Sequence, residues 1–433
     1  MILGMKFSHG FAGTACWLMT SAMEQQLSAF FLRRGVVLKQ SITFYRNQLI
    51  FCLAAVPLGA VVGAICAFFG SVLLKITAFR NSHSFALLPF LGVAGVVIVW
   101  CYQKFGKESN KGMSLLFEVH QEQRASIPLR LVPMSMGSTW MTHLFGGSAG
   151  REGVAVQIGG TLGNFIGNKI KVSDGNKILM IAGMAAGFGG LFRIPLTAVF
   201  FSLEVLRRGA IEYAALLPSV VAAFTTDYVS GLLEGEKFTH FIGGQMTLNF
   251  GVVVKLIVMG VVFGLIGMLF SILLKKLKVA LSGWMQNSIL RILACGTAIA
   301  VLSIACFQGR YSGFGTNLVE GAFSGDIMPW DFALKILFTT LTLAAGYCGG
   351  EVIPLCSIGA SAGFVLAGVL GLPVELCVAL GYVSVLGSAT NTFFAPVFMG
   401  IEVFGTRYIP WFAVVCAIAY ICNGRKSVYS LQK

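Results

Sequence analysis

The segment GREGVAVQIG, residues 150–159, places an arginine and a glutamate among glycines inside an otherwise apolar region. A second segment, GGEVIP at residues 349–354, repeats the glycine and glutamate pattern in the other half of the chain. A charged side chain at the centre of a bilayer costs on the order of 2.5 to 3.5 kcal/mol even on lenient scales. Glu152 and Glu351 are therefore interpreted as functional carboxylates that lie in glycine-rich breaks between membrane helices.

The composition around these segments predicts an all-α protein that crosses a membrane many times. The chain has 433 residues, of which 56% are hydrophobic and 11% charged, whereas a soluble domain carries roughly 25% charged residues. Apolar runs such as residues 49–74 and 256–274 have the length that a span needs, and the chain offers roughly ten to fourteen apolar segments on that criterion. The basic residues that give a net charge of +14 cluster in the short links, which is typical of contact with anionic lipid. Nucleic-acid binding is disfavoured because aromatic and basic residues do not interleave on a polar surface.

Residues outside the apolar runs give little sign of other chemistry. The eleven cysteines form no CxxC pair and the five histidines show no ligand spacing, so no metal or cofactor is predicted. Residues 1–45 are expected to form an N-terminal segment with a helix lying on the membrane over about residues 15–45, without a cleavable signal peptide. Translation can begin at Met1, Met5, Met19 or Met23. Residues 46–429 are the predicted transmembrane domain, and residues 430–433 a short tail.

An internal repeat relates the two halves of this domain, about residues 48–232 and 247–429. Glycines recur in order: Gly159, Gly163, Gly183 and Gly189 correspond to Gly359, Gly363, Gly381 and Gly387. Repeated halves in transporters place a site at the bilayer midplane, where broken helices aim their N-termini inward. A helix N-terminus carries about half a positive charge and free N–H groups, which suit an anion. The alternative explanation for many of these glycines is close helix packing.

The acidic residues within apolar stretches divide into two groups. Glu204 and Glu402 occupy equivalent positions in the two repeats, and they are interpreted mainly as structural groups that cap or bond a neighbouring helix. Asp227 also falls in an apolar stretch. Glu152 and Glu351 lie at or near the first turn of a helix, where a carboxylate can itself occupy an anion site. Protonation would free that site, so anion and proton would compete for it, which is the minimum machinery of anion/proton exchange.

The motifs resemble those of the CLC family of chloride channels and transporters. GREGVAVQIG is similar to the GREGP-type signature of the family and GGEVIP to its GxFxP segment. Tyr429, expected at the start of the last helical stretch, matches the anion-coordinating tyrosine. The resemblance covers about residues 45–430 and implies two inverted-topology repeats with broken and re-entrant helices. It also implies a homodimer with one pore per subunit and, because no regulatory domain is seen after residue 430, a prokaryotic-type member in the plasma membrane.

Four departures from the family pattern resemble its fluoride/proton antiporter branch. Met113 stands where chloride transporters have a serine, and Val154 replaces the proline of GREGP. Glu351 replaces an apolar residue, and Val205 replaces the inner proton-relay glutamate. Ser114 can take the place of Met113 if the alignment shifts by one residue. The fluoride branch would also be expected to have a threonine near the Glu351 motif and a lysine before its glycines, where this chain has Ile353 and Cys348.

The resemblance implies a role for each candidate residue. Glu152 would be the gate and proton acceptor, and Glu351 would couple anion to proton from the second half. Met113 and Tyr429 would flank the central anion. Backbone N–H donors would come from the residues around the two motifs, namely Gly150, Arg151, Gly153, Val352 and Ile353. The predicted function is a secondary active transporter that exports fluoride in exchange for protons.

Three alternatives remain. A chloride/proton exchanger of the same fold is the main one, and Val205 argues against it. A passive anion channel would carry flux without proton movement. The sequence GGSAG at residues 146–150 has the GxSxG spacing of serine hydrolases, with His143 nearby, but His143 precedes Ser148, and apolar segments that read as helices surround both, so the strand–turn–helix context of such enzymes is missing.

Overall fold

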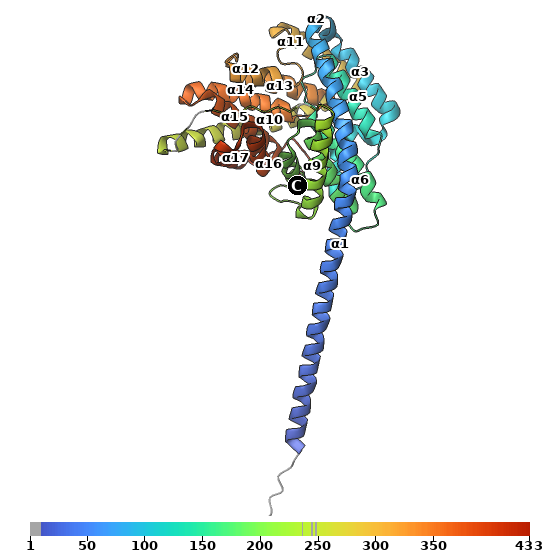
Figure 1. The fold of residues 1–433 in the computed structure, drawn as a ribbon. Helices are drawn as coiled ribbons and strands as arrows, with labels where there is room; N and C mark the ends of the chain where they lie inside the picture. Colours follow the sequence, from blue (N-terminus) through green and yellow to red (C-terminus); the bar gives the residue numbers. More distant parts are fainter. Residues whose placement is uncertain (1–9, 236, 244–245, 247–248) are drawn as a thin grey trace, which may run out of the picture. The chain divides into compact units, whose positions relative to one another are not determined.

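The computed structural model describes residues 10–235, 237–243, 246 and 249–433, and most of these residues are helical (Figure 1). The helices of the first half are α1 (Gly10–Ser82), α2 (Ser84–Leu87), α3 (Leu91–Cys101), α4 (Ser114–His120), α5 (Leu131–Leu144), α6 (Glu152–Lys169), α7 (Gly175–Phe192), α8 (Pro195–Glu204) and α9 (Leu216–Leu232). Those of the second half are α10 (Phe250–Trp284), α11 (Ser288–Ala305), α12 (Thr316–Ser324), α13 (Asp331–Ala345), α14 (Val352–Leu370), α15 (Val374–Thr390), α16 (Phe394–Phe404) and α17 (Ile409–Cys422). Short 3-10 and π turns, η1 (Leu88–Phe90), η2 (Tyr102–Gly106), η3 (Lys107–Lys111), η4 (Tyr213–Ala215), η5 (Phe307–Gly309) and η6 (Thr406–Tyr408), connect them.

The chain divides into two units, residues 1–50 and residues 51–433. Helix α1 includes the segment predicted to be helical over about residues 15–45, so that segment is helical. Its location on the membrane surface stays a prediction. Met1 and Met5 lie outside the described residues.

Seven helical segments among the described residues are long and apolar enough to cross a membrane. They are Ser41–Ser82, Ser84–His120, Gly175–Phe192, Tyr213–Leu232, Phe250–Trp284, Ser288–Ala305 and Val352–Leu370. Four shorter apolar helices accompany them: Pro195–Glu204, Val374–Thr390, Phe394–Phe404 and Thr406–Cys422. The predicted apolar segments thus include helices too short to span a bilayer, as expected where helices are broken at its centre. The protein is an integral, multi-pass membrane protein.

The glycine repeat read from the sequence corresponds to a repeated packing contact. Helix α6 packs on α7 in the first half, and α14 packs on α15 in the second. A Cβ atom on Gly159 would lie 1.9 Å from the Gly183 carbonyl oxygen, and one on Gly359 would lie 2.0 Å from that of Gly381. Both helix pairs therefore approach so closely that only glycine fits. Close packing explains these four glycines.

Replacing Gly359 with alanine is expected to destabilise the protein strongly, because the added methyl group has no room against the Gly381 backbone. Gly368 in the same helix is a matched control, since a Cβ atom there meets no atom within 4 Å and alanine favours a helix by about 0.5–1 kcal/mol. Thermal unfolding in detergent should show G359A well below the unsubstituted protein and G368A at or above it. Equal midpoints for the two variants would contradict the packing account.

The two halves cap each other's helices. At the end of α8, the Glu204 carboxylate accepts hydrogen bonds from the Phe394 and Ala395 N–H groups, both at 3.0 Å, at the start of α16. At α16, Glu402 accepts from the Leu196 and Thr197 N–H groups at 2.9 and 2.8 Å, in the first turn of α8. The structural interpretation of Glu204 and Glu402 is confirmed, because each satisfies N–H groups that a helix start leaves unpaired.

Replacing Glu402 with alanine should lower the free energy of unfolding by about 2–4 kcal/mol, because charge-assisted bonds are lost and buried N–H groups are left unpaired. The Thr197 hydroxyl, which donates to Glu402 at 2.6 Å, loses its partner as well. Glu375, exposed in the first turn of α15, provides a control of the same residue type. Thermal unfolding that is unaltered in E402A would show that the cap contributes nothing.

Candidate functional site

The two repeats meet at Gly150 and Gly350, next to the two candidate carboxylates. The Gly150 N–H donates to the Gly350 carbonyl at 2.6 Å, and the Gly350 N–H donates to the Gly150 carbonyl at 2.7 Å. A Cβ atom on Gly150 would lie 2.3 Å from a Glu152 carboxylate oxygen, and one on Gly350 would lie 2.7 Å from the Gly153 nitrogen. Glycine at both positions thus lets the N-termini of α6 and α14 converge on one point.

The Glu152 carboxylate lies where those helix starts converge. Glu152 is fully buried. Its Oε2 atom accepts hydrogen bonds from the Arg151 N–H at 3.0 Å and from the Ile353 N–H at 3.3 Å, one from each half. Its Oε1 atom has no hydrogen-bond partner among the described residues. The carboxylate therefore occupies a position built by backbone N–H groups, which is the type of position that binds anions.

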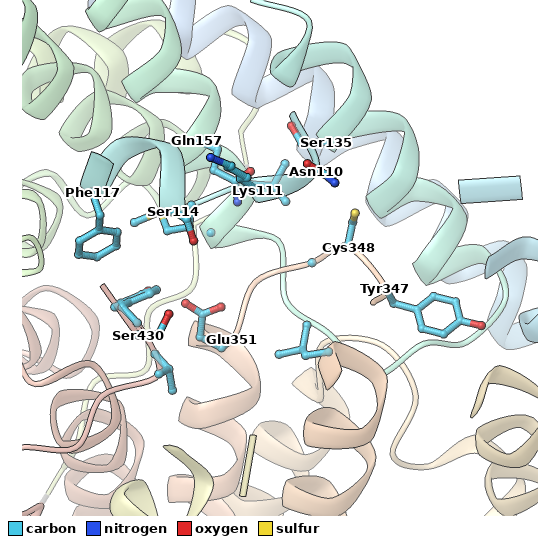
Figure 2. A pocket seen from close by; sticks show the side chains of 18 of the residues that line it. Asn110, Lys111, Ser114, Phe117, Ser135, Gln157, Tyr347, Cys348, Glu351 and Ser430 are labelled. Carbon is cyan, nitrogen blue, oxygen red and sulfur yellow. The ribbon is translucent and has the colours of Figure 1, made fainter. Parts of the chain in front are cut away.

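A cavity of about 210 Å³, called the Glu351 cavity below, adjoins this point on one side (Figure 2). Gly153 and Val154 line it, as do Glu351, Met113 and Tyr429. Figure 2 shows the Glu351 carboxylate pointing into it, toward Ser114 and Phe117. Its further polar and charged lining residues are Tyr102, Ser109, Asn110, Lys111, Ser135, Gln157, Lys278, Tyr347, Cys348 and Ser430.

A second cavity, of about 250 Å³, adjoins the same point and is called the Arg151 cavity. Arg151 and Ile353, the residues whose N–H groups bind Glu152, both line it. The Arg151 guanidinium lies over the rings of Phe192 and Phe314, 5.6 and 5.1 Å from their centroids. Arg151 thus lines this cavity and Gly153 and Val154 line the Glu351 cavity, so the two cavities reach the chain on either side of residue 152.

Glu351 is the second carboxylate of the site. It is half-buried at the start of α14. Tyr429 and Lys278 line the same cavity as Glu351. One of the Glu351 oxygens, Oε1, has no hydrogen-bond partner among the described residues. A carboxylate, a phenol and an ammonium group thus line the Glu351 cavity.

The remaining predicted anion ligands are also found near these cavities. Met113 and Ser114 both line the Glu351 cavity. Whichever of the two corresponds to the serine of chloride transporters, the residue lies at this cavity. The prediction that Tyr429 begins a helix is wrong, because α17 ends at Cys422 and Tyr429 lies in a non-helical segment. Its ring packs against Phe117 with 5.5 Å between centroids. Val352 is buried and its neighbour Ile353 supplies the N–H donor described above.

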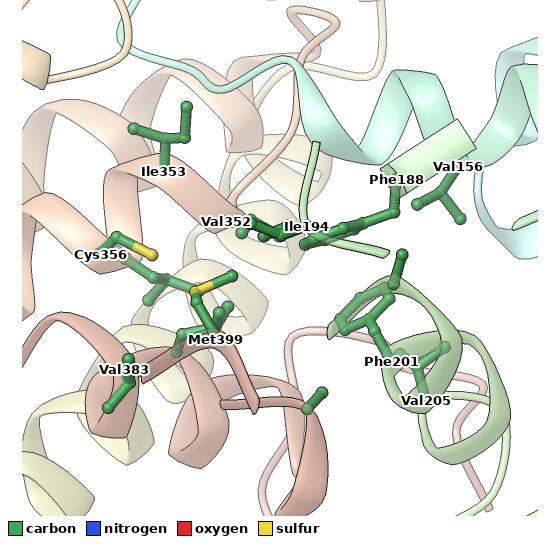
Figure 3. Close-up of a cluster of buried hydrophobic side chains, with 14 of the residues drawn as sticks. Val156, Phe188, Ile194, Phe201, Val205, Val352, Ile353, Cys356, Val383 and Met399 are labelled. Atoms are coloured by element: carbon green, nitrogen blue, oxygen red, sulfur yellow. The ribbon is translucent and has the colours of Figure 1, made fainter. Parts of the chain in front are cut away.

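Val205, which replaces a relay glutamate, is fully buried in an apolar cluster (Figure 3). Phe201, Phe188 and Ile194 belong to the same cluster, which extends to Val352. The labelled side chains of this cluster carry no carboxylate. These labelled residues therefore provide no acidic side chain that could carry a proton between position 205 and the site.

Sequence reasoning overlooked several polar residues around the site, of which Lys335 is the most conspicuous. Lys335 lies in α13 and is fully buried. A single lysine within the apolar run of residues 332–345 was the available signal. Ser148, considered as a hydrolase nucleophile, is buried and its hydroxyl is 3.0 Å from the Lys335 ammonium and 2.9 Å from the Thr339 hydroxyl. His143 instead contacts the Gly150 carbonyl, at 3.4 Å.

Fold and site together define a membrane protein of two repeats with an anion-type site at paired helix N-termini. The family model described as "Voltage gated chloride channel" matches residues 94–424. This chain belongs to that family, the CLC family.

Individual relatives refine this assignment. A "Chloride/fluoride channel protein" of Pseudomonas syringae pv. tomato is 35% identical over 379 residues, which cover 86% of this chain and 83% of that protein. The crystal structure of a CLC-type fluoride/proton antiporter matches with a TM-score of 0.88 and 45% identity, covering 90% of this chain and 99% of that one. A slow cyanobacterial Cl⁻/H⁺ antiporter shares the fold, with a TM-score of 0.76 and 18% identity over 86% of this chain and 94% of its own.

Proposed function

We propose that this protein exchanges a small anion for protons across the membrane, and that it exports fluoride. The observation that carries the proposal is the position of the Glu152 carboxylate. It is held by N–H groups of both repeats, and the residues that flank Glu152 in the chain line the Glu351 and Arg151 cavities. A charged carboxylate there excludes an anion from the same N–H groups. A neutral, protonated one is held less firmly and leaves the position to the anion.

In this mechanism Glu152 is both the gate and the proton acceptor. With its proton it swings away from the helix N-termini and the anion takes its place. When the proton leaves, the carboxylate returns and displaces the anion. The N–H groups of Arg151 and Gly153 in one repeat, and of Val352 and Ile353 in the other, are the proposed anion donors. The Gly150 N–H, which the sequence predicted as a further donor, donates to the Gly350 carbonyl at 2.6 Å instead.

Glu351 supplies the second titratable group. Val205 has an apolar side chain and packs among apolar side chains, so this position offers no carboxylate to a proton that leaves Glu152. Glu351 lines the cavity next to Glu152 together with Met113 and Tyr429. We therefore assign the coupling of proton to anion to Glu351, with Met113 and Tyr429 flanking the transported ion.

Fluoride is favoured over chloride by the relatives. The structure that is 45% identical is a fluoride/proton antiporter, and the Pseudomonas protein is named for both ions. A thioether at Met113 offers no hydrogen-bond donor, unlike a serine hydroxyl. Neutral HF crosses membranes and ionises inside a cell, so export coupled to proton entry would clear fluoride. A chloride/proton exchanger is the alternative.

The proposed setting is a prokaryotic plasma membrane, with a homodimer that has one pore per subunit. The family assignment supports both statements. The N-terminal helix up to about residue 45 is proposed to lie on the membrane surface.

Ion flux from liposomes that contain the purified protein tests this function. Fluoride, chloride and pH electrodes would record the three ions together. Fluoride efflux with opposed proton movement and little chloride flux is the expected result. Dominant chloride flux with proton coupling would establish the alternative, and anion flux without proton movement would overturn exchange altogether.

A further inference from the structure

One face of helix α13 carries a buried polar stripe that the proposed exchange does not use. Asp331, Lys335, Thr339 and Thr342 follow one another at helical spacing, and all four are fully buried. Polar side chains at such spacing share one face of a helix. Burying a lysine is costly, so an apolar residue would serve packing better. The stripe therefore calls for an explanation other than packing.

The Lys335 ammonium binds neutral oxygens. Its three N–H groups donate to the Ser148 hydroxyl at 3.0 Å, the Tyr311 carbonyl at 3.0 Å and the Gly313 carbonyl at 2.8 Å. Asp331, one turn away, is instead bonded by the Tyr311 hydroxyl at 2.6 Å and by Arg310 at 2.9 Å. Among the described residues, Lys335 forms no ion pair within 4.0 Å. The Lys335 ammonium therefore binds two loops, one at Ser148 and one at Tyr311 and Gly313.

The first loop leads directly into Glu152, and the second is bonded to the first. Ser148 precedes the Gly150 bridge by two residues, and it receives three contacts from α13. Lys335 donates to the Ser148 hydroxyl, and Thr339 shares a hydrogen bond with that hydroxyl at 2.9 Å. The Ser148 N–H donates to the Thr342 hydroxyl at 3.2 Å. The second loop is tied to the first, because the Gly313 N–H donates to the Gly147 carbonyl at 3.1 Å.

We propose that Lys335 is a positioning residue for ion exchange: with Thr339 and Thr342 it fixes the loop at Ser148, and thereby the register of Glu152 against its N–H donors. The Gly150–Gly350 bridge fixes the loop at one end and the α13 stripe fixes it at the other. The inference rests on the proposed function, since register matters only if Glu152 and the anion compete for one position. A displacement of about 1 Å at such a site is enough to cost on the order of 100-fold in rate.

Helix α13 offers a matched pair of substitutions that separates this role from general stability. Thr339 and Thr340 are both fully buried in α13. The Thr339 hydroxyl contacts Ser148, whereas the Thr340 hydroxyl donates only to carbonyls of its own helix, Ile336 at 2.7 Å and Leu337 at 3.2 Å. Valine replaces threonine without changing the shape of the side chain. T339V therefore removes a bond to the loop, and T340V removes a bond within the helix.

The experiment measures fluoride and proton movement together in liposomes that contain the full chain with K335M, T339V, S148A or T340V. K335M is expected to slow fluoride transport about tenfold or more, since bonds from a charged donor are lost. The ratio of fluoride ions to protons moved by K335M should be at least about twice that of the unsubstituted protein, because a misplaced Glu152 lets anions pass without exchange. T339V and S148A should shift this ratio in the same direction, and T340V should leave it unchanged.

The outcomes separate the two proposals. An unsubstituted protein that moves no protons refutes the proposed exchange itself. Coupled transport by the unsubstituted protein, with the same fluoride-to-proton ratio in K335M, T339V and S148A, overturns the positioning role and leaves Lys335 as a stability residue. If K335M does not yield folded protein, as judged by size-exclusion profile and thermal unfolding, T339V and S148A decide, because each retains the Lys335 ammonium. An unchanged ratio in both overturns the inference.

Discussion

Replacing Glu152 with glutamine is expected to abolish proton movement while anions continue to cross. Glutamine has the size of a protonated glutamate but no proton to exchange, and without charge it cannot compete with an anion for the Arg151 and Ile353 N–H groups. Proton flux should fall by about 100-fold or more, the range in which positioned acid–base groups act. Simultaneous fluoride and pH recordings from liposomes measure the change.

Glu375→Gln is the control for this variant, because Glu375 is exposed at the start of α15. This substitution should leave the coupling of anion to proton movement unaltered. Proton movement that persists in Glu152→Gln at the stoichiometry of the unsubstituted protein would show that another group carries the proton. The assignment of Glu152 as gate and proton acceptor would then be wrong.

Replacing Glu351 with glutamine is expected to lower proton movement as well. Unlike in Glu152→Gln, anion flux should also be slow. Glutamine keeps the shape of the Glu351 cavity and removes its carboxylate, while Glu152 remains to occupy the anion position. With the Glu351 carboxylate removed and an apolar side chain at Val205, the Glu152 proton loses its proposed acceptor, so both fluxes should fall by about tenfold or more. The same liposome recording reports both ions.

The double variant Glu152→Gln/Glu351→Gln makes the second prediction sharper. Groups that act as one unit show strongly non-additive effects, so the double variant should resemble Glu152→Gln alone, with anion flux that is not coupled to protons. Stoichiometric proton exchange in Glu351→Gln would instead place the coupling outside Glu351.

The parts of the fold that rest on local pattern were predictable from the sequence. Glycines that recur in the same order in both halves indicated a repeat, and the structure shows the close helix approaches that require them at Gly159 and Gly359. Charged residues within apolar runs indicated polar partners, and Glu204 and Glu402 have them. Lys335 was missed because its partners come from segments far away in sequence: Ser148 lies 187 residues before it.

Long-range contacts also explain the error at Tyr429. The last residues read as a helical stretch, yet tertiary hydrogen bonds hold them in a non-helical path. The Gln432 side chain donates to the Val205 and Thr390 carbonyls at 2.9 and 3.1 Å, and the Val428 N–H donates to the Ala389 carbonyl at 3.0 Å. Because tertiary contacts override local helix preference, the path of this segment is set by the body of the protein.

The exchanged caps between α8 and α16 have a consequence for biosynthesis. Glu402 follows Leu196, whose N–H it accepts, by 206 residues, and a ribosome adds about 5–20 residues per second. The first half therefore waits in the membrane for about 10–40 s with the start of α8 unpaired. During that interval those N–H groups lack their Glu402 partner, so the nascent first half is expected to be less stable than the finished protein.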